Sequence, residues 1–281
     1  PCDLILATVP DSDRVGVAVW HEEGWHLLNG NQVGVLLADF LLAHMDPVDL
    51  AGAVVVKTIV TTEMVLPIAR KYNVDVMNTL TGFKYIGDLI DELPAQGKHF
   101  VFGFEESYGY LAGTAVRDKD AVLTSVLVAK MAAYYKEQGK TLVQRLEELM
   151  EEHGYYVEGL RSYAFSGTVE AQLAKEFISQ LRKEPLREIG GEVVTVVRDY
   201  GRSVELDLAQ GTSAPITLPQ EDVIQWLTDQ GSKVTIRPSG TEPKMKLYLG
   251  VRAGSLADAR ERLKVLEGAF DALVQKGLKK A

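Results

Sequence analysis

The stretch AVVVKTIVTTEMVLPIARKYNVDVMNTLTGFKYIGDLIDELPAQGKHFVFGF, residues 53–104, decides the fold class. Runs rich in β-branched and aromatic residues alternate in it with longer stretches of helical periodicity. We expect strands over residues 53–60, 74–78 and 99–104, and helices over residues 62–72, with a threonine cap, and 84–93. Strands alternating with helices of this length indicate βαβ units and a mostly parallel sheet.

The flanking residues extend this pattern on both sides. Before it we expect strands over residues 3–8 and 15–20, a turn at 29–31, and a helix over 32–45 that Asp46-Pro47 ends. After it we expect a helix over 120–136 and another opened by Thr141, with Gln144 completing a capping box.

Beyond Gly154 the pattern changes to strands in succession, bracketed by helices. We expect strands over residues 155–165, 193–198, 222–228, 233–237 and 246–251, and helices over 169–182 and 256–276, the last ended by Gly277. The predicted fold class is α/β: a mixed, mostly parallel α/β/α domain followed by an α+β domain with an antiparallel sheet. The boundary is expected near residue 157.

Composition limits the class of protein. The chain has 281 residues, 46% apolar and 25% charged, which is typical of a globular protein of about two domains. The single cysteine, Cys2, excludes an internal disulfide framework and favours a reducing, cytoplasmic setting. No uncharged apolar run reaches the roughly 20 residues of a membrane helix. The net charge of −9 argues against nucleic acid as the main partner.

A basic turn is the strongest sequence signal for ligand binding. Between two expected strands the chain reads TIRPSGTEPK, residues 235–244. The guanidinium of Arg237 can grip phosphate oxygens in bidentate fashion, and Ser239, Gly240 and Thr241 add hydroxyl and backbone donors in the same turn. Residues 231–252 hold five basic side chains and one acidic one. The turn indicates a phosphate site, although a hairpin with solvated lysines has the same composition.

Two further loops follow expected strands of the parallel sheet: GFEESYGY, residues 103–110, and TGFK, residues 81–84. Ligands of open α/β sheets bind at the carboxyl ends of the strands. Glu105 and Ser107 are therefore candidates to hydrogen-bond with sugar hydroxyls. Gly82 admits a close backbone approach, and Lys84 offers a point charge. Solvated surface turns are the alternative interpretation of both loops.

Two charged segments carry weaker signals. Lys119, in the segment RDKD at residues 117–120, is a candidate proton-transfer group whose pKa would fall on burial. A helix cap with alternating charge explains the same segment. The loop PDSDR, residues 10–14, holds Asp11 and Asp13, which can converge on one hard cation such as Mg²⁺. A turn rich in aspartate is again the alternative.

Taken in order, the segments ATVPDSDR, TGFK, GFEESYG, RDKD and RPSGTEPK resemble the α-D-phosphohexomutases, in particular the phosphoglucomutase/phosphomannomutase branch. The resemblance spans essentially the whole chain and implies the C-terminal half of a four-domain enzyme. Residues 1–25 would be the end of the second domain with its metal-binding loop. Residues 26–156 would be the α/β sugar-binding third domain, and residues 157–281 the α+β phosphate-binding fourth domain.

The resemblance also implies a mechanism. A phosphoserine in the first domain would pass its phosphoryl group to a hexose 1-phosphate, and the bisphosphate would return the other phosphate to leave hexose 6-phosphate, with Mg²⁺ neutralising charge. Carried onto this chain, the substrate contacts are Glu105, Ser107, Gly82, Phe83, Lys84, Arg237, Ser239, Gly240 and Thr241, the metal ligands are Asp11 and Asp13, and the catalytic candidates are Lys119 and Arg14.

Two departures from the family pattern bear on activity. Val9 stands where the metal loop has its first aspartate, so a Mg²⁺ site would be weakened, and no segment like Thr-Ala-Ser-His-Asn occurs to carry the phosphoserine. We therefore expect a hexose phosphate as substrate, N-terminal domains as the missing partner, no nucleic-acid or membrane partner, and no turnover by this chain alone. The alternative is a non-catalytic sugar-phosphate-binding protein or a degenerate paralogue.

Overall fold

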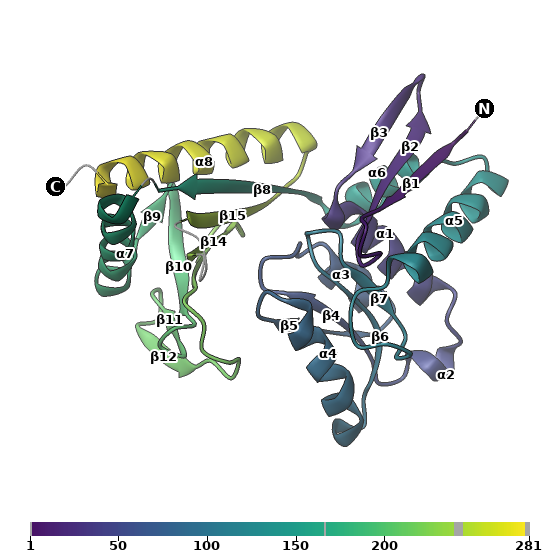
Figure 1. The fold of residues 1–281 in the computed structure, drawn as a ribbon, viewed down its shortest axis with the longest axis horizontal. Coiled ribbons are helices and arrows are strands. Elements are labelled where there is room, and N and C mark those ends of the chain that lie inside the picture. The colour runs from purple at the N-terminus through teal and green to yellow at the C-terminus, as the bar shows by residue number, and fades with distance from the viewer. Residues whose placement is uncertain (1, 166, 239–243, 279–281) are drawn as a thin grey trace. The chain divides into compact units, whose positions relative to one another are not determined.

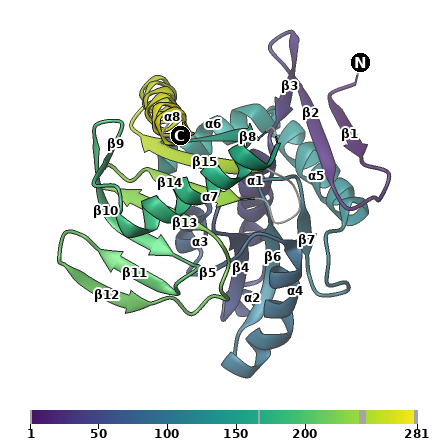
Figure 2. The same cartoon turned by 60° about the vertical axis from the view of Figure 1, so that its left-hand side comes forward.

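The computed structural model describes residues 2–165, 167–238 and 244–278. The chain divides into two compact units, Pro1–Gly154 and Tyr155–Ala281, whose elements are labelled in Figures 1 and 2. The predicted fold class is confirmed, because the first unit contains a mostly parallel sheet and the second an antiparallel one, each with helices. No helix within the three described ranges is long and apolar enough to cross a membrane.

A four-stranded sheet forms the centre of the first unit, in the order β5 (Asp75–Thr79), β4 (Ala53–Thr58), β6 (His99–Phe104) and β7 (Tyr110–Ala112). β4 pairs in parallel with β5 and β6, and β7 adds antiparallel to β6. All six residues of β4 are buried. Since successive side chains of a strand point to opposite faces, both faces of this sheet are covered, and β4 reads as an almost continuous apolar run.

The helices of this unit are α1 (Gly30–Ala43), α2 (Pro47–Leu50), α3 (Val65–Lys71), α4 (Phe83–Glu92), the 3₁₀ turn η1 (Leu93–Gln96), α5 (Ala121–Glu137) and α6 (Leu142–His153). α4 packs Phe83, Ile86 and Ile90 into a core that includes Val54 and Val56 of β4. The expected capping box at the start of α6 is confirmed: the Thr141 and Gln144 side chains bond reciprocally to each other's backbone N–H.

Two local expectations are wrong. Asn29 is the N-cap of α1 rather than part of a separate turn, because it and Gln32 form a capping box. α3 begins at Val65, and its N-cap, Met64, has no side-chain cap. Thr62 does not cap this helix, since its hydroxyl accepts a hydrogen bond from Met64 N at 3.2 Å within the preceding turn.

A separate antiparallel sheet, β1-β2-β3, precedes α1 and consists of β1 (Leu4–Thr8), β2 (Val15–His21) and β3 (Gly24–Leu28). Trp20 lies opposite Trp25, and their rings form an edge-to-face pair with centroids 5.4 Å apart. Both indoles are about two-fifths exposed. β3 is not among the expected strands, because its sequence GWHLL contains no β-branched residue.

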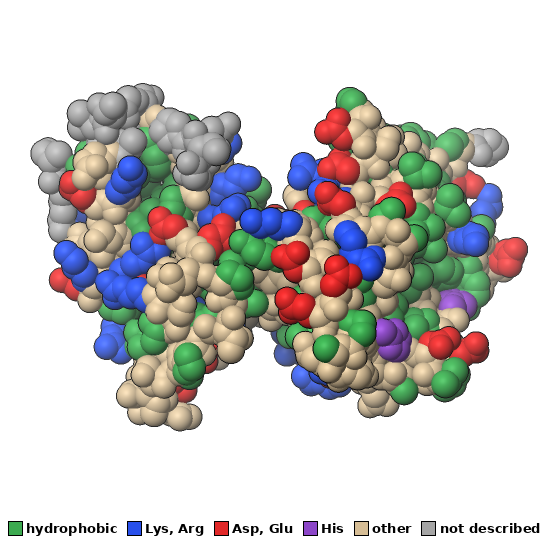
Figure 3. All heavy atoms as spheres, turned by 60° about the horizontal axis from the view of Figure 1, so that its bottom comes forward, with side chains coloured by type: hydrophobic (Ala, Val, Ile, Leu, Met, Phe, Trp, Pro, Cys, Tyr) green, Lys and Arg blue, Asp and Glu red, His purple; other side chains and the backbone are tan. Residues whose placement is uncertain are grey.

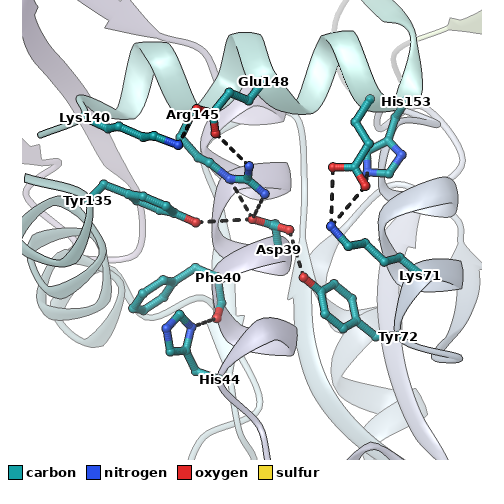
Figure 4. A network of polar contacts seen from close by, with 11 residues as sticks. Asp39, Phe40, His44, Lys71, Tyr72, Tyr135, Lys140, Arg145, Glu148 and His153 are labelled. Carbon is teal, nitrogen blue, oxygen red and sulfur yellow. Dashed lines mark hydrogen bonds and ion pairs between the residues drawn. The ribbon is translucent and has the colours of Figure 1, made fainter. Parts of the chain in front are cut away.

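A buried carboxylate ties several helices of the first unit together (Figure 4). Asp39 of α1 is 1% exposed and accepts hydrogen bonds from Arg145 Nη2 at 2.8 Å and Nε at 3.1 Å. The hydroxyls of Tyr72 and Tyr135 donate to Asp39 at 3.2 and 3.4 Å. Burial, followed by the charge of Asp39, raises the pKa of Tyr135 to about 12, so this hydroxyl remains a donor at neutral pH.

The second unit is an eight-stranded antiparallel sheet with two helices. The strand order is β12-β11-β10-β13-β14-β15-β8, with β9 paired to β10. The elements are β8 (Tyr155–Ala164), α7 (Gly167–Lys183), β9 (Glu188–Ile189), β10 (Glu192–Asp199), β11 (Val204–Asp207), β12 (Thr212–Pro215), β13 (Ile224–Thr228), β14 (Lys233–Pro238), β15 (Lys244–Ala253) and α8 (Leu256–Leu278). Side chains of both helices and of the strands share one core, in which Trp226 is fully buried 5.9 Å from the Phe270 ring centroid.

Gly277 is itself helical and is followed by Leu278, the last described residue of α8, so the expectation that Gly277 terminates this helix is wrong. A Cβ at this position would stand 2.3 Å from the Phe177 ring of α7. Glycine is therefore required here by the close approach of two helices, not by the backbone conformation of a cap.

Candidate functional site

Glu105 follows the carboxyl end of β6 and is only 7% exposed. Its Oε1 accepts a hydrogen bond from Gly82 N at 3.1 Å, and its Oε2 accepts a long one from Ser107 Oγ at 3.5 Å. Its own N–H donates to Gly109 O at 2.9 Å, which closes the loop between β6 and β7. The structure thus brings together the two loops that follow β5 and β6.

The environment of Glu105 disfavours its charged form. Burial raises the pKa of this carboxyl, and the opposing influences of Lys119, Gly82 N–H, Arg14 and Ser107 do not cancel the effect of burial. A carboxyl with few fixed donors retains acceptor capacity for the hydroxyl groups of a ligand.

Lys119 lies between two carboxylates and its side chain is 12% exposed. Its Nζ is 2.8 Å from Asp118 Oδ1 and 3.5 Å from Asp13 Oδ2. Burial alone would raise the pKa of Asp118, but hydrogen bonds from the Lys119 ammonium and backbone N–H hold it below its ordinary value. The ammonium therefore joins the RDKD segment to the aspartate loop near the N-terminus.

The stem of Lys119 runs across the backbone of Gly109. A Cβ on Gly109 would stand 2.5 Å from Lys119 Cδ and 3.2 Å from Glu105 Oε2, so the absent side chain provides the space that both groups use. The Lys119 ammonium also lies 5.3 Å from the centroid of the Phe83 ring, which is itself buried in the core. Lys84 is exposed, with its Nζ 4.6 Å from the neighbouring Tyr85 ring, and no described contact links it to Glu105.

The aspartate loop between β1 and β2 packs onto these elements. Val9 N donates to Arg14 O at 3.1 Å and closes the loop. Ser12 O accepts from Ala121 N at 3.1 Å, at the start of α5, and Arg14 forms a β-bridge with Gly109. Four segments that lie far apart in the sequence therefore meet at one place in the first unit: the aspartate loop, TGFK, GFEESYG and RDKD.

The basic turn belongs to the second unit. Arg237, at the end of β14, pairs with Glu221, its Nε and Nη2 lying 2.9 and 2.8 Å from Glu221 Oε1. Ser239, Gly240 and Thr241 lie outside the described residues. The face drawn in Figure 3 carries acidic and basic side chains intermixed on the second unit, not a purely basic patch.

Lys57 is a candidate that sequence analysis does not identify. It is fully buried near the carboxyl end of β4, with its Nζ 3.0 Å from Glu63 Oε1 and 3.4 Å from the carbonyl oxygens of Thr58 and Thr61. Thr61 Oγ1 in turn donates to Glu106 Oε2 at 3.4 Å. The sequence signal for Lys57 is a single charge inside the apolar run AVVVKTIV. A buried ammonium is unfavourable unless it has hydrogen-bonding partners, so such a charge indicates a specific site.

Most of the chain is similar to known proteins. The family model "Phosphoglucomutase/phosphomannomutase, alpha/beta/alpha domain III" matches residues 29–153, from the N-cap of α1 to the last residue of α6. A phosphoglucomutase of Staphylococcus aureus (strain MW2) is 35% identical over 266 residues, which are 94% of this chain and 47% of the relative. The phosphoglucomutase of Staphylococcus epidermidis is 36% identical over 89% of this chain and 45% of the relative.

Residues 29–153 belong to the phosphoglucomutase/phosphomannomutase family. The chain spans about half the length of the curated relatives it matches. Two solved structures share the fold at lower identity. A putative phosphomannomutase from Thermus thermophilus superimposes with a TM-score of 0.63 at 20% identity, over 97% of this chain and 46% of that one. The open form of pp63/parafusin from Paramecium superimposes with a TM-score of 0.67 at 16% identity, over 98% of this chain and 45% of that one.

The aspartate loop fits a metal ion poorly for a member of this family. Val9 is 41% exposed and offers no ligand atom, and Asp13 Oδ2 is 3.5 Å from the Lys119 ammonium. Within the part of the chain that the structure describes, no group of three or more His, Cys, Asp or Glu side chains could hold a metal ion. Asp11 and Asp13 alone would leave Mg²⁺ bound mainly to water.

Proposed function

We propose that this chain binds a hexose phosphate and is the substrate-binding half of a phosphohexomutase, which moves a phosphoryl group between the 1- and 6-positions of the sugar. The observation that carries the proposal is the buried, incompletely satisfied carboxyl of Glu105 at the meeting point of four segments. Such a group suits the recognition of neutral hydroxyls, which donate hydrogen bonds without bringing charge.

In this proposal the first unit recognises the sugar. Glu105 accepts hydrogen bonds from sugar hydroxyls, and Ser107 can donate to an adjacent hydroxyl or accept from it. Gly82 lets the backbone lie close to the sugar ring. The ring of Phe83 lies beneath the ammonium of Lys119 and would support it from the side of the core. Lys84 is exposed at the start of α4, so its part would be limited to a point charge at the rim.

The second unit is proposed to hold the non-reacting phosphate through Arg237 together with Ser239, Gly240 and Thr241. The planar guanidinium matches two phosphate oxygens at once, and hydrogen bonds to a charged group contribute about 1.5–3 kcal/mol. Removing Arg237 should therefore weaken phosphate binding by about ten- to a hundredfold.

Proton transfer is proposed for Lys119, with Arg14 supporting the charge. When a sugar hydroxyl oxygen bonds to phosphorus, its proton must leave, and the bond from phosphorus to the donor oxygen must break. The donor is a phosphoserine that this sequence does not contain, so turnover would require the rest of a phosphohexomutase. That part of the enzyme is the proposed partner of this chain.

A second candidate is a sugar-phosphate-binding protein without turnover. Val9 and the pairing of Asp13 with Lys119 favour it, because both weaken the metal site. A coupled assay from glucose 1-phosphate to glucose 6-phosphate, with Mg²⁺ and glucose 1,6-bisphosphate, separates the two. We expect no turnover by the 281-residue chain alone. Turnover after addition of the N-terminal half of a Staphylococcus relative would support the mutase, and its absence would support the binding protein.

Calorimetric titration tests the binding itself. Glu105→Ala should weaken glucose 1-phosphate binding but leave inorganic phosphate binding unchanged, whereas Arg237→Ala should weaken both. Glu151→Ala, which removes an exposed carboxylate of α6, is the charge-matched control and should match the parent. Unchanged glucose 1-phosphate affinity in both Glu105→Ala and Arg237→Ala would refute the proposed function.

A further inference from the structure

Glu221 holds Arg237 by one edge of its guanidinium. Arg237 Nε and Nη2 both lie against Glu221 Oε1, at 2.9 and 2.8 Å. The guanidinium is planar, and Nε and Nη2 form its side edge. The end edge, formed by Nη1 and Nη2, is therefore directed away from Glu221.

The backbone beneath Glu221 is itself fixed. Glu221 O accepts from Val223 N at 2.7 Å, and Val223 O accepts from Tyr200 N at 3.1 Å. The next side chain, Asp222, is paired with Arg182 Nη2, and Arg182 Nε donates to Asp199 at 3.2 Å. The backbone that carries Glu221 is thus held in place independently of Arg237.

The pair is not arranged as a saturated salt bridge. Both donors of Arg237 use one oxygen, whereas the most favourable geometry for arginine and a carboxylate is a fork in which both oxygens accept. Glu221 Oε2 is buried and has no hydrogen-bond partner among the residues that the structure describes. Stability of the fold alone does not explain such a contact, since a buried unsatisfied oxygen is unfavourable.

We propose that Glu221 is a positioning residue for phosphate binding, which holds the side edge of Arg237 so that its end edge receives two phosphate oxygens. This inference rests on the proposed function, in which Arg237 binds the phosphate. A free arginine side chain loses rotamer freedom when it binds, and an arginine that is already held loses less. The charge of Glu221 repels phosphate, so its benefit comes from orientation rather than from attraction.

Two substitutions separate orientation from charge. Glu221→Gln keeps an oxygen acceptor for Arg237 but removes the repulsion, so it should bind inorganic phosphate at least as tightly as the parent. Glu221→Ala removes both, and should bind about tenfold more weakly than Glu221→Gln, the order expected when a rotamer-rich side chain must be ordered on binding. Phosphate binding is measured by calorimetry on the full chain. The ¹⁵N–¹H signal of Arg237 Nε, read by NMR, should persist in Glu221→Gln and broaden through solvent exchange in Glu221→Ala.

A matched control lies on the same sheet. Arg198 Nε donates to Glu205 Oε2 at 2.6 Å, and the side chains of that pair are 33% and 35% exposed, against 33% and 21% for Arg237 and Glu221. Glu205→Ala should broaden the Nε–H signal of Arg198 and leave phosphate binding unchanged.

Three outcomes overturn the inference. Equal tightening of phosphate binding by Glu221→Gln and Glu221→Ala would make Glu221 a competing anion. An unchanged Arg237 Nε–H signal in Glu221→Ala would mean that Glu221 does not hold the guanidinium. If Arg237→Ala binds phosphate as the parent does, the proposed phosphate site itself fails, and the inference fails with it. That third result is distinct from the first two, in which Arg237→Ala still loses binding.

Discussion

Asp39 and Glu105 are both carboxylates buried in the first unit, 1% and 7% exposed, but their surroundings differ. Asp39 receives four hydrogen bonds, from the guanidinium of Arg145 and from two tyrosine hydroxyls. Glu105 receives one backbone N–H at 3.1 Å and one serine hydroxyl at 3.5 Å.

The difference separates a structural carboxylate from a candidate functional one. A carboxylate can accept about four hydrogen bonds, and the fold supplies all of them to Asp39. Burial raises the pKa of Glu105 because the fold supplies too few, which leaves lone pairs for a ligand. Burial alone thus does not identify a site, whereas burial with unused acceptor capacity does.

Removing the saturated carboxylate should have the largest effect on the fold. Asp39→Ala leaves the Arg145 guanidinium and the hydroxyls of Tyr72 and Tyr135 without their acceptor, and should lower the free energy of unfolding by about 3–5 kcal/mol. Urea denaturation measures this loss, with Glu151→Ala on the exposed side of α6 as the control. A loss below about 1 kcal/mol, the contribution of an exposed ion pair, would contradict a structural role for the contacts of Asp39.

Glu105→Gln should show a smaller effect of opposite sign. The folded pKa of Glu105 lies above its unfolded value, so the stability that its protonated form contributes is present below the unfolded pKa and is lost as pH rises through the folded pKa. Glutamine does not titrate. As pH rises through this window, the unfolding free energy of the parent should therefore fall relative to that of Glu105→Gln. Parallel pH profiles for the two proteins would contradict a raised pKa.

The exposed aspartate loop offers the smallest change. Val9→Asp adds a third carboxylate to Asp11 and Asp13 and should tighten Mg²⁺ binding by about tenfold, because hard cations gain affinity with each oxygen ligand. Calorimetric titration with Mg²⁺ measures it, and Val9→Asn, which adds an oxygen without charge, is the control. If neither variant binds Mg²⁺ more tightly than the parent, these residues do not form a metal loop.

Sequence reasoning identifies the central strands well because their physical signal is local. The run AVVVKTIV predicts a strand buried on both faces, and its first six residues form β4. The capping box of Thr141 and Gln144 fixes the start of α6. Short edge strands such as β7 and β12 are missed, because three or four residues give no period to detect. Their pairing depends on neighbours that are distant in the sequence.

The site divides in the same way. That the loops at Gly82 and Glu105 meet follows from the shared edge of parallel strands. The pairing of Lys119 with Asp13, and of Arg237 with Glu221, depends on chain reversals and side-chain reach that no local pattern records. Phe83 illustrates the limit: its place in a motif predicts a ligand contact, whereas the amphipathic face of α4 takes the ring into the core.

The three tryptophans of the chain are divided between its two units, so each unit has an intrinsic fluorescence probe. Trp20 and Trp25 stand half-exposed on the hairpin of the first unit, and Trp226 is sealed in the core of the second. Their emission should differ in colour and in access to a soluble quencher, the hairpin pair emitting at longer wavelength and quenching readily. Heating or denaturant should then reveal, without any label, whether the two units lose their structure together or one after the other.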